Sequence, residues 1–399
     1  MSRLRTDILA AWLGRGKAGP AVNQHIPALT GLRFVLALWV ILHHLTGKRM
    51  MLDAWAQSLP AGVHAILRGG YLAVGAFFVL SGFVLALSYG STSWNSASLM
   101  RYGVGRFARL YPTYLLTLVV IAPFAGDYLF QTGAGSPLFS QKATQLTIYG
   151  FALQGWSKPV VHWNTPAWSL SCELFFYVCF PLIALCLPKS SRFKALAAAG
   201  ASLLLPHLMK PLGVPPEWKP LYHLADFLLG IGAAGAYEML RELKPRSWRN
   251  GFWLYAPAFA AGAFMIVYPQ IGGSSMNLNR ALRPVHALLI VGLALGGGLP
   301  ARMLSTRFAT YLGKASYCMY ILHIPLLWWY KRTWLHESGY LSQGVSALVY
   351  LVGVVAISAL VSRIVEEPAN RRIREWFRTQ FTWLHSTQFI TKMAAGEPG

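Results

Sequence analysis

The stretch IPALTGLRFVLALWVILHHL, from Ile26 to Leu45, decides the fold because it is long and apolar enough to cross a bilayer as one helix. It nevertheless contains Arg33 and His44. The two residues are eleven positions apart, which places them within about 20° of the same helix face and roughly 16 Å apart along the axis. Ionisable groups inside a membrane span are costly, so their presence indicates a functional site.

Composition extends this interpretation to the whole chain. Of the 399 residues, 55% are hydrophobic and 12% charged. We expect an all-α, polytopic integral membrane protein of about ten transmembrane helices, with a weaker stretch from Leu146 to Trp156 too short to span. The ten segments lie near residues 27–46, 70–90, 110–126, 168–187, 195–209, 219–239, 252–269, 283–299, 309–330 and 341–362.

The net charge of +22 raises the question of nucleic acid binding, but its distribution favours a membrane topology. With ten spans and the amino terminus inside, 22 basic residues fall in cytoplasmic segments and 11 in external ones. This is the positive-inside pattern. We therefore expect a cytoplasmic tail at 1–25, a membrane domain at 26–363 and a second cytoplasmic tail at 364–399, without a cleaved signal peptide.

Orientation assigns a depth to each polar residue within a span. It places His44 near the outer surface, and Glu173, at the start of the segment PAWSLSCELFFYVCFPL, at the same depth. A carboxylate facing a histidine fixes its tautomer and raises its basicity, as a general base requires. The sequence thus predicts His44 and Glu173 as a catalytic pair; a structural ion pair between two helices is the alternative.

Other polar residues are candidates for binding the acceptor substrate. Asp226 and His323 are predicted to lie in the outer half of the membrane, although a hydrogen bond tying two helices together is the alternative for each. Trp163 and Asn164 fall in the longest external loop, where a tryptophan belongs to the interfacial aromatic belt or stacks on a sugar ring.

Two arginines follow the second span on the cytoplasmic side. Arg106 and Arg109 are three residues apart, so they share a helix face. Such a pair binds lipid headgroups or clamps phosphates. The cysteines show no metal-ligand spacing, and we predict no metal site.

Six motifs together resemble the acyltransferase 3 family of bacterial integral membrane acyltransferases. They occur in family order between about residues 26 and 370. The segments are LTGLRFVLALWVILHH with its Arg33-x10-His44 spacing, FFVLSGFVL (Phe77 to Leu85), RFARLYP, WSLSCELFFY (Trp168 to Tyr177), ASYCMYILHIP (Ala315 to Pro325) and VEEP.

The resemblance implies an enzyme of the bacterial inner membrane that moves an acyl group, most simply acetyl, from cytoplasmic acyl-CoA to a carbohydrate at the outer face. It carries over the family's essential histidine and arginine to His44 and Arg33, and its arginine pair to Arg106 and Arg109. Because coenzyme A is polyanionic, we expect the three arginines together to bind its phosphates, with His44 as the base deeper in the membrane. Single-domain relatives resemble enzymes that decorate exopolysaccharides, and the implied partners are acetyl-CoA as co-substrate, a lipid-linked or polymeric glycan, membrane lipids and the polysaccharide assembly machinery.

Two questions stay open from sequence alone. In the implied reaction His44 acts either as a general base toward the sugar hydroxyl or as a nucleophile that carries the acyl group. A different class of protein, a transporter or flippase, also uses buried Arg, His, Glu and Asp, but it is expected to show internal symmetry, which this sequence lacks. A non-catalytic scaffold would leave the Arg33 and His44 stripe unexplained.

Overall fold

The computed structural model describes residues 26–48, 50–130, 137–157, 163–188, 190–209, 211–243, 252–271, 275–296, 298–334 and 340–394. Within these ranges every regular element is a helix. The expectation of an all-α membrane protein is therefore confirmed.

The long helices follow one another along the chain with short helices between them. They are α2 (Pro27–Leu45), α5 (Leu72–Tyr89), α6 (Ser96–Phe130), α8 (Trp168–Cys186), α9 (Ser191–Met209), α10 (Lys219–Leu243), α11 (Phe252–Ile271), α12 (Ser275–Ala294), α15 (Ser316–Trp334), α16 (Tyr340–Val361) and α17 (Glu367–Ala394). The shorter ones are α3 (Asp53–Gln57), α4 (Ala61–Arg68), α7 (Pro137–Gly150), α13 (Gly298–Leu304) and α14 (Arg307–Lys314).

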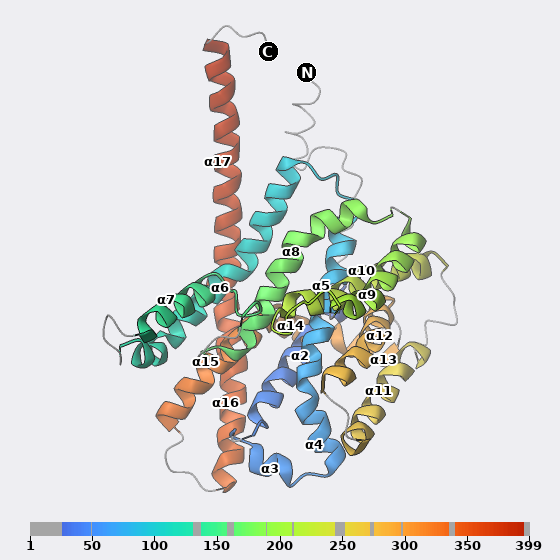
Figure 1. Cartoon of the computed structure of the whole chain (residues 1–399), viewed down its shortest axis with the longest axis vertical. Coiled ribbons are helices and arrows are strands. Elements are labelled where there is room, and N and C mark those ends of the chain that lie inside the picture. The colour runs from blue at the N-terminus through green and yellow to red at the C-terminus, as the bar shows by residue number, and fades with distance from the viewer. Residues whose placement is uncertain are drawn as a thin grey trace.

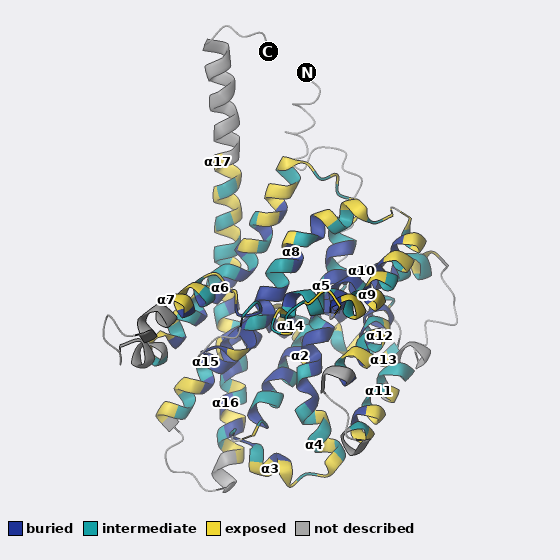
Figure 2. Cartoon of the chain, viewed as in Figure 1, coloured by how far each residue is buried: buried dark blue, intermediate teal, exposed yellow. Residues whose placement is uncertain are grey.

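Eight of the ten apolar segments predicted from sequence fall mainly on one of these helices. The segment 283–299 extends past the end of α12 to the start of α13, and the segment 309–330 covers parts of both α14 and α15. Five stretches of the described residues are long and apolar enough to cross a membrane, and the bent pair α12 and α13 makes a sixth. The count of ten spans and the orientation of the termini stay predictions. Outward-facing side chains of α16 are apolar and exposed (Figure 2), as expected of a surface that contacts lipid: Val345, Leu348, Val349 and Val352.

Helices α5 and α10 approach so closely that their backbones touch. A β-carbon on Gly82 would overlap the carbonyl oxygen of Phe227, and one on Gly230 would overlap that of Val79. Small residues at such crossings allow the close packing that holds membrane helices together. This contact fixes α5, which forms one wall of the site described below.

The elements are arranged along one long axis (Figure 1). Helix α17 lies at one end of this axis, and α3 and α4 lie at the other. Helix α2 ends beside α3, whereas α8 begins only part-way along the axis. The helices therefore do not all begin and end at the same two levels.

The segment before α8 explains its displaced start. Residues 149–155 fold into the bundle instead of lying outside it, and their backbone groups are bonded by side chains. Tyr111 and Tyr114 donate to the carbonyl oxygens of Gly150 and Tyr149, and the Ser171 hydroxyl donates to that of Ala152. Non-helical backbone is tolerated among membrane helices only where its polar groups are satisfied in this way. Within the predicted short segment Leu146 to Trp156, alternate parts are buried and exposed: Tyr149, Ala152 and Gln154 are buried, whereas Leu146, Phe151 and Leu153 are exposed.

Candidate active site

A cavity with a volume of about 100 Å³ lies between helices α2, α5, α6, α8 and α15. Its lining joins charged groups with aromatic rings, and the polar members are Arg33, Ser81, Arg106, Arg109, Ser169, Glu173, Tyr177, Ser316, Tyr317 and Tyr320. Four residues predicted from sequence, three arginines and one glutamate, thus meet in one place.

The arginines reach the cavity from two helices. Arg33 comes from α2, while Arg106 and Arg109 come from successive turns of α6. Arg33 lies close enough to both others, and to Glu173, to interact with them electrostatically. Three guanidinium groups against one carboxylate leave an excess of positive charge, so the cavity attracts an anion.

Arg106 is surrounded by tyrosine rings. Its guanidinium carbon lies 5.6 Å from the ring centroid of Tyr89, 5.9 Å from that of Tyr102 and 5.5 Å from that of Tyr177. Cations over aromatic faces at this distance are attracted by the ring quadrupole. The Nε of Arg106 is buried and has no hydrogen-bond partner, so it can donate to a ligand.

The predicted pairing of Glu173 with His44 is wrong. Glu173 accepts a hydrogen bond from the Tyr177 hydroxyl and faces the arginines of the cavity. The depth argument failed because it assumed that α8 starts at the outer surface. Because α8 begins only part-way along the long axis of the molecule, Glu173 lies close to Arg33 and the other cavity arginines instead of His44.

His44 is instead paired with His323. Its Nδ1 lies 3.3 Å from Nε2 of His323 and 2.9 Å from the Val40 carbonyl oxygen of its own helix. His323, on α15, is 1% exposed, and its Nδ1 lies 2.7 Å from the carbonyl oxygen of Tyr320. Two residues that the sequence assigned to different roles are therefore in direct contact.

Two aromatic rings separate this histidine pair from the cavity. Phe77 and Tyr320 both line the cavity, and their ring centroids are 5.9 Å apart. On the far side, the Tyr320 ring is 6.1 Å from that of His323, and Phe77 packs against the buried cluster that contains Ile41 and Leu45. Tyr320, which with Phe77 forms the Phe77–Tyr320 layer, thus contacts both the cavity and His323, the partner of His44.

Trp163 and Asn164 lie outside the cavity lining. Both are buried, at 6% and 1% exposure. The Trp163 ring packs 4.8 Å from that of Tyr149, and the Asn164 amide donates to the Ile321 carbonyl oxygen on α15. Their position in this structure is that of packing residues at the start of α8, because the loop that carries them folds inward.

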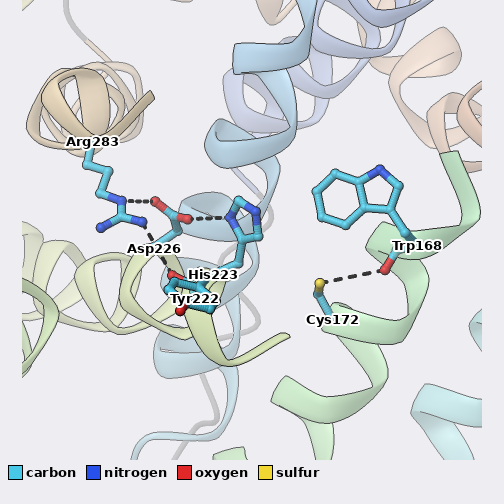
Figure 3. Close-up of polar contacts among 6 residues, drawn as sticks. All are labelled: Trp168, Cys172, Tyr222, His223, Asp226 and Arg283. Atoms are coloured by element: carbon cyan, nitrogen blue, oxygen red, sulfur yellow. Dashed lines mark hydrogen bonds and ion pairs between the residues drawn. The ribbon is translucent and has the colours of Figure 1, made fainter. Parts of the chain in front are cut away.

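Asp226 is also absent from the cavity lining and belongs to a second cluster of buried charge (Figure 3). The carboxylate is fully buried, and both of its oxygens are bonded. Oδ1 accepts from Nε of Arg283 at 2.6 Å, and Oδ2 lies 2.8 Å from Nδ1 of His223. The His223 ring in turn lies 5.1 Å from Phe78 and 5.3 Å from Trp168.

The geometry therefore combines an anion-attracting cavity with a histidine pair beyond its end, in a helical membrane protein. A family model described as an acyltransferase domain matches residues 26–363, most of the chain. The chain belongs to the acyltransferase 3 family. It is accordingly a membrane acyltransferase.

Curated relatives agree with this family. Acyltransferase MdmB of Streptomyces mycarofaciens is 27% identical over 87% of this chain and 92% of its own length. O-acetyltransferase OatA of Staphylococcus aureus is 23% identical over 88% of this chain, which spans 58% of OatA. Protein 2 in picA locus of Rhizobium radiobacter is 36% identical over 24% of this chain and 44% of its own length. No solved structure matches the chain.

Some residues of this acyltransferase's site were not predicted from sequence. Tyr177 follows Glu173 by four residues, a helical spacing that could have indicated the hydrogen bond between them. Glu366 lies in the VEEP motif. It is buried on a π-helical turn (Ser362–Glu366) and accepts from Cys318 Sγ and Ser362 Oγ, each at 3.1 Å. No cluster of metal-ligating side chains occurs among the described residues.

Proposed function

We propose that this acyltransferase moves an acetyl group from acetyl-CoA, entering from the cytoplasm, to a hydroxyl group of a carbohydrate at the outer face of the bacterial inner membrane. The acceptor we favour is an exopolysaccharide unit or another cell-surface glycan. The observation that carries the proposal is the cavity with three arginines, whose lining includes the Phe77–Tyr320 layer next to His323, the partner of His44.

The arginine end suits coenzyme A. Its nucleotide end carries several phosphate charges, and guanidinium groups bind phosphate with paired hydrogen bonds. Arg106 and Arg109 lie about 15–20 Å along α6 from its first residue, Ser96, at a rise of about 1.5 Å per residue. The flexible arm of the donor then spans the distance to a thioester held deeper in the bundle.

The reaction at the other end needs a base. In direct transfer, Nε2 of His44 takes the hydroxyl proton while the acceptor oxygen bonds to the acetyl carbon. The carbon–sulfur bond breaks, and coenzyme A leaves as its thiolate toward the arginines. The alternative route, through an acetyl group carried on His44, needs the same nitrogen.

Glu173 takes a different part from the one predicted. Bonded to Tyr177, whose ring lies beside Arg106, it orders the donor side of the cavity and partly balances its charge. We therefore assign Glu173 to donor binding and the base to His44. Either route requires the rings of Phe77 and Tyr320 to move apart.

Inside-out membrane vesicles test the proposal because they contain the native acceptor and expose the cytoplasmic face. With acetyl-CoA labelled in the acetyl group, we expect alkali-labile label on a membrane-bound glycan. Vesicles from a strain that lacks the gene are the control. Label that appears equally without the gene, or label found only on protein or phospholipid, would contradict the carbohydrate acceptor.

A further inference from the structure

The protons of the His44–His323 pair can be placed from its acceptors. A carbonyl oxygen only accepts, so the nitrogen that faces it must carry hydrogen. Nδ1 of His323 faces the Tyr320 carbonyl oxygen, and Nδ1 of His44 faces that of Val40. Both rings therefore hold a proton on Nδ1.

This placement determines what the rings present to one another. Nε2 of His323 faces Nδ1–H of His44 at 3.3 Å, and it must be unprotonated because two N–H groups would repel. His323 is thus neutral, and the single Nδ1–H of His44 is shared between the Val40 carbonyl oxygen at 2.9 Å and Nε2 of His323 at 3.3 Å. Nε2 of His44, the nitrogen not used in these contacts, is left with its lone pair.

We infer that His323 is a positioning residue that acts through His44, which rests on the proposed function of His44 as the reactive base. When Nε2 of His44 gains a proton or an acetyl group, positive charge spreads over the ring and strengthens its Nδ1–H bond to His323. The neutral imidazole thereby takes the part that a carboxylate plays in a serine hydrolase triad.

The proton balance closes without another reactant. His44 gains the hydroxyl proton on Nε2 and shares its Nδ1 proton with His323, to which it can pass. After transfer the thiolate of coenzyme A, or water, takes one proton, and the pair returns to two neutral rings. Tyr350 donates to the His323 carbonyl oxygen at 2.5 Å and holds this turn of α15 against α16.

Two substitutions separate the bonds that His323 makes. Asparagine places its amide near the position of Nδ1, so His323→Asn keeps a donor for the Tyr320 carbonyl oxygen and loses the contact with His44. Glutamine places its amide near the position of Nε2, so His323→Gln keeps an acceptor for His44. The buried histidine of another helix, His286, provides a matched control as His286→Gln.

The assay uses the inside-out vesicles with labelled acetyl-CoA, normalised to the amount of enzyme. We expect His323→Asn to lower the maximal rate about 10- to 100-fold, the range for a lost hydrogen bond to a charged group, with little change in the KM for acetyl-CoA. His323→Gln should stay within about threefold of the unaltered enzyme. Equal loss in both variants, or a change in KM alone, would overturn the positioning role.

A spectroscopic measurement does not depend on turnover. In purified, 15N-histidine-labelled protein, nitrogen shifts report which ring nitrogen of His44 carries the proton, with the signal assigned by its loss in His44→Asn. We expect Nδ1–H. A proton on Nε2 would overturn the inference even if transfer occurs, whereas Nδ1–H together with full activity of His44→Ala would instead refute the proposed base.

Discussion

Two clusters of buried charge lie in this helix bundle, and they differ in balance and in space. Around Asp226, one arginine and one histidine bind both oxygens of a single carboxylate. Around Glu173, three arginines face one carboxylate across a cavity. Buried charges that serve only the structure are paired with charges of the opposite sign. Unbalanced charge beside a cavity therefore favours a ligand-binding site, and balanced charge favours a structural tie.

The largest effect is expected from a substitution that removes the proposed base, His44, beyond the cavity. We expect His44→Ala to lower acetyl transfer about 10²- to 10⁴-fold, the usual contribution of general-base catalysis, with an unchanged amount of protein in the membrane. The measurement is label transfer in vesicles with an immunoblot for enzyme. A variant that keeps more than a tenth of the activity would remove His44 from the chemistry.

Substitution of Asp226 should lower the stability of the protein instead of its affinity for the donor. Asp226→Ala leaves Arg283 buried without its carboxylate, at an expected cost of about 3–5 kcal/mol. Thermal unfolding in detergent measures this. The double variant Asp226→Leu with Arg283→Met removes both charges and should recover most of the loss. Failure to recover, with a raised KM for acetyl-CoA, would instead make Asp226 part of the site.

The cavity arginines should show the opposite behaviour. Each of Arg106→Ala and Arg109→Ala should raise the KM for acetyl-CoA about 10- to 100-fold with a smaller effect on kcat, because a charged hydrogen bond contributes about 1.5–3 kcal/mol. Arg109→Lys should also weaken binding, since lysine lacks the paired donors. Unchanged KM in both alanine variants would make these arginines lipid-headgroup anchors.

The smallest effect concerns the tyrosines around Arg106. The Tyr102 hydroxyl is buried without a hydrogen-bond partner, so Tyr102→Phe removes a group that contributes nothing to the cation–π contact. We expect the KM for acetyl-CoA to change less than about twofold, whereas Tyr102→Leu, which removes the ring, should raise it about two- to fivefold. Equal effects of both changes would show that the hydroxyl, not the ring, holds the arginine.

The sequence predicted the helices well because apolar length is a local property. The sequence also predicted that three arginines act together, and Arg33, Arg106 and Arg109 do meet in the cavity. Each of them lies on a helix that the apolar pattern of the sequence locates correctly. Glu173 was placed at the wrong level, and Trp163 and Asn164 were placed outside the bundle. All three errors have one source, the segment of residues 149–155.

The fold of residues 149–155 depends on long-range contacts, which a hydropathy pattern does not report. This inward fold depends on hydrogen bonds from Tyr111 and Tyr114 on α6 and from Ser171 on α8. Such long-range contacts do not appear in the order of apolar and polar residues. The partner of His44 was missed for the same reason, because His323 is 279 positions away.

The Phe77–Tyr320 layer also bears on how loss of the donor by hydrolysis is avoided. A thioester that waits in a site open to both sides of a membrane would be lost to hydrolysis. Here the rings lie between the donor cavity and the histidine pair, and the Tyr320 hydroxyl is bonded to Ser169 at 2.8 Å. If acetyl-CoA is the donor, as we propose, an acetyl group in the cavity would stay apart from His44 until these rings move. Transfer would then depend on the moment when the rings open, so that little donor would be spent without a product.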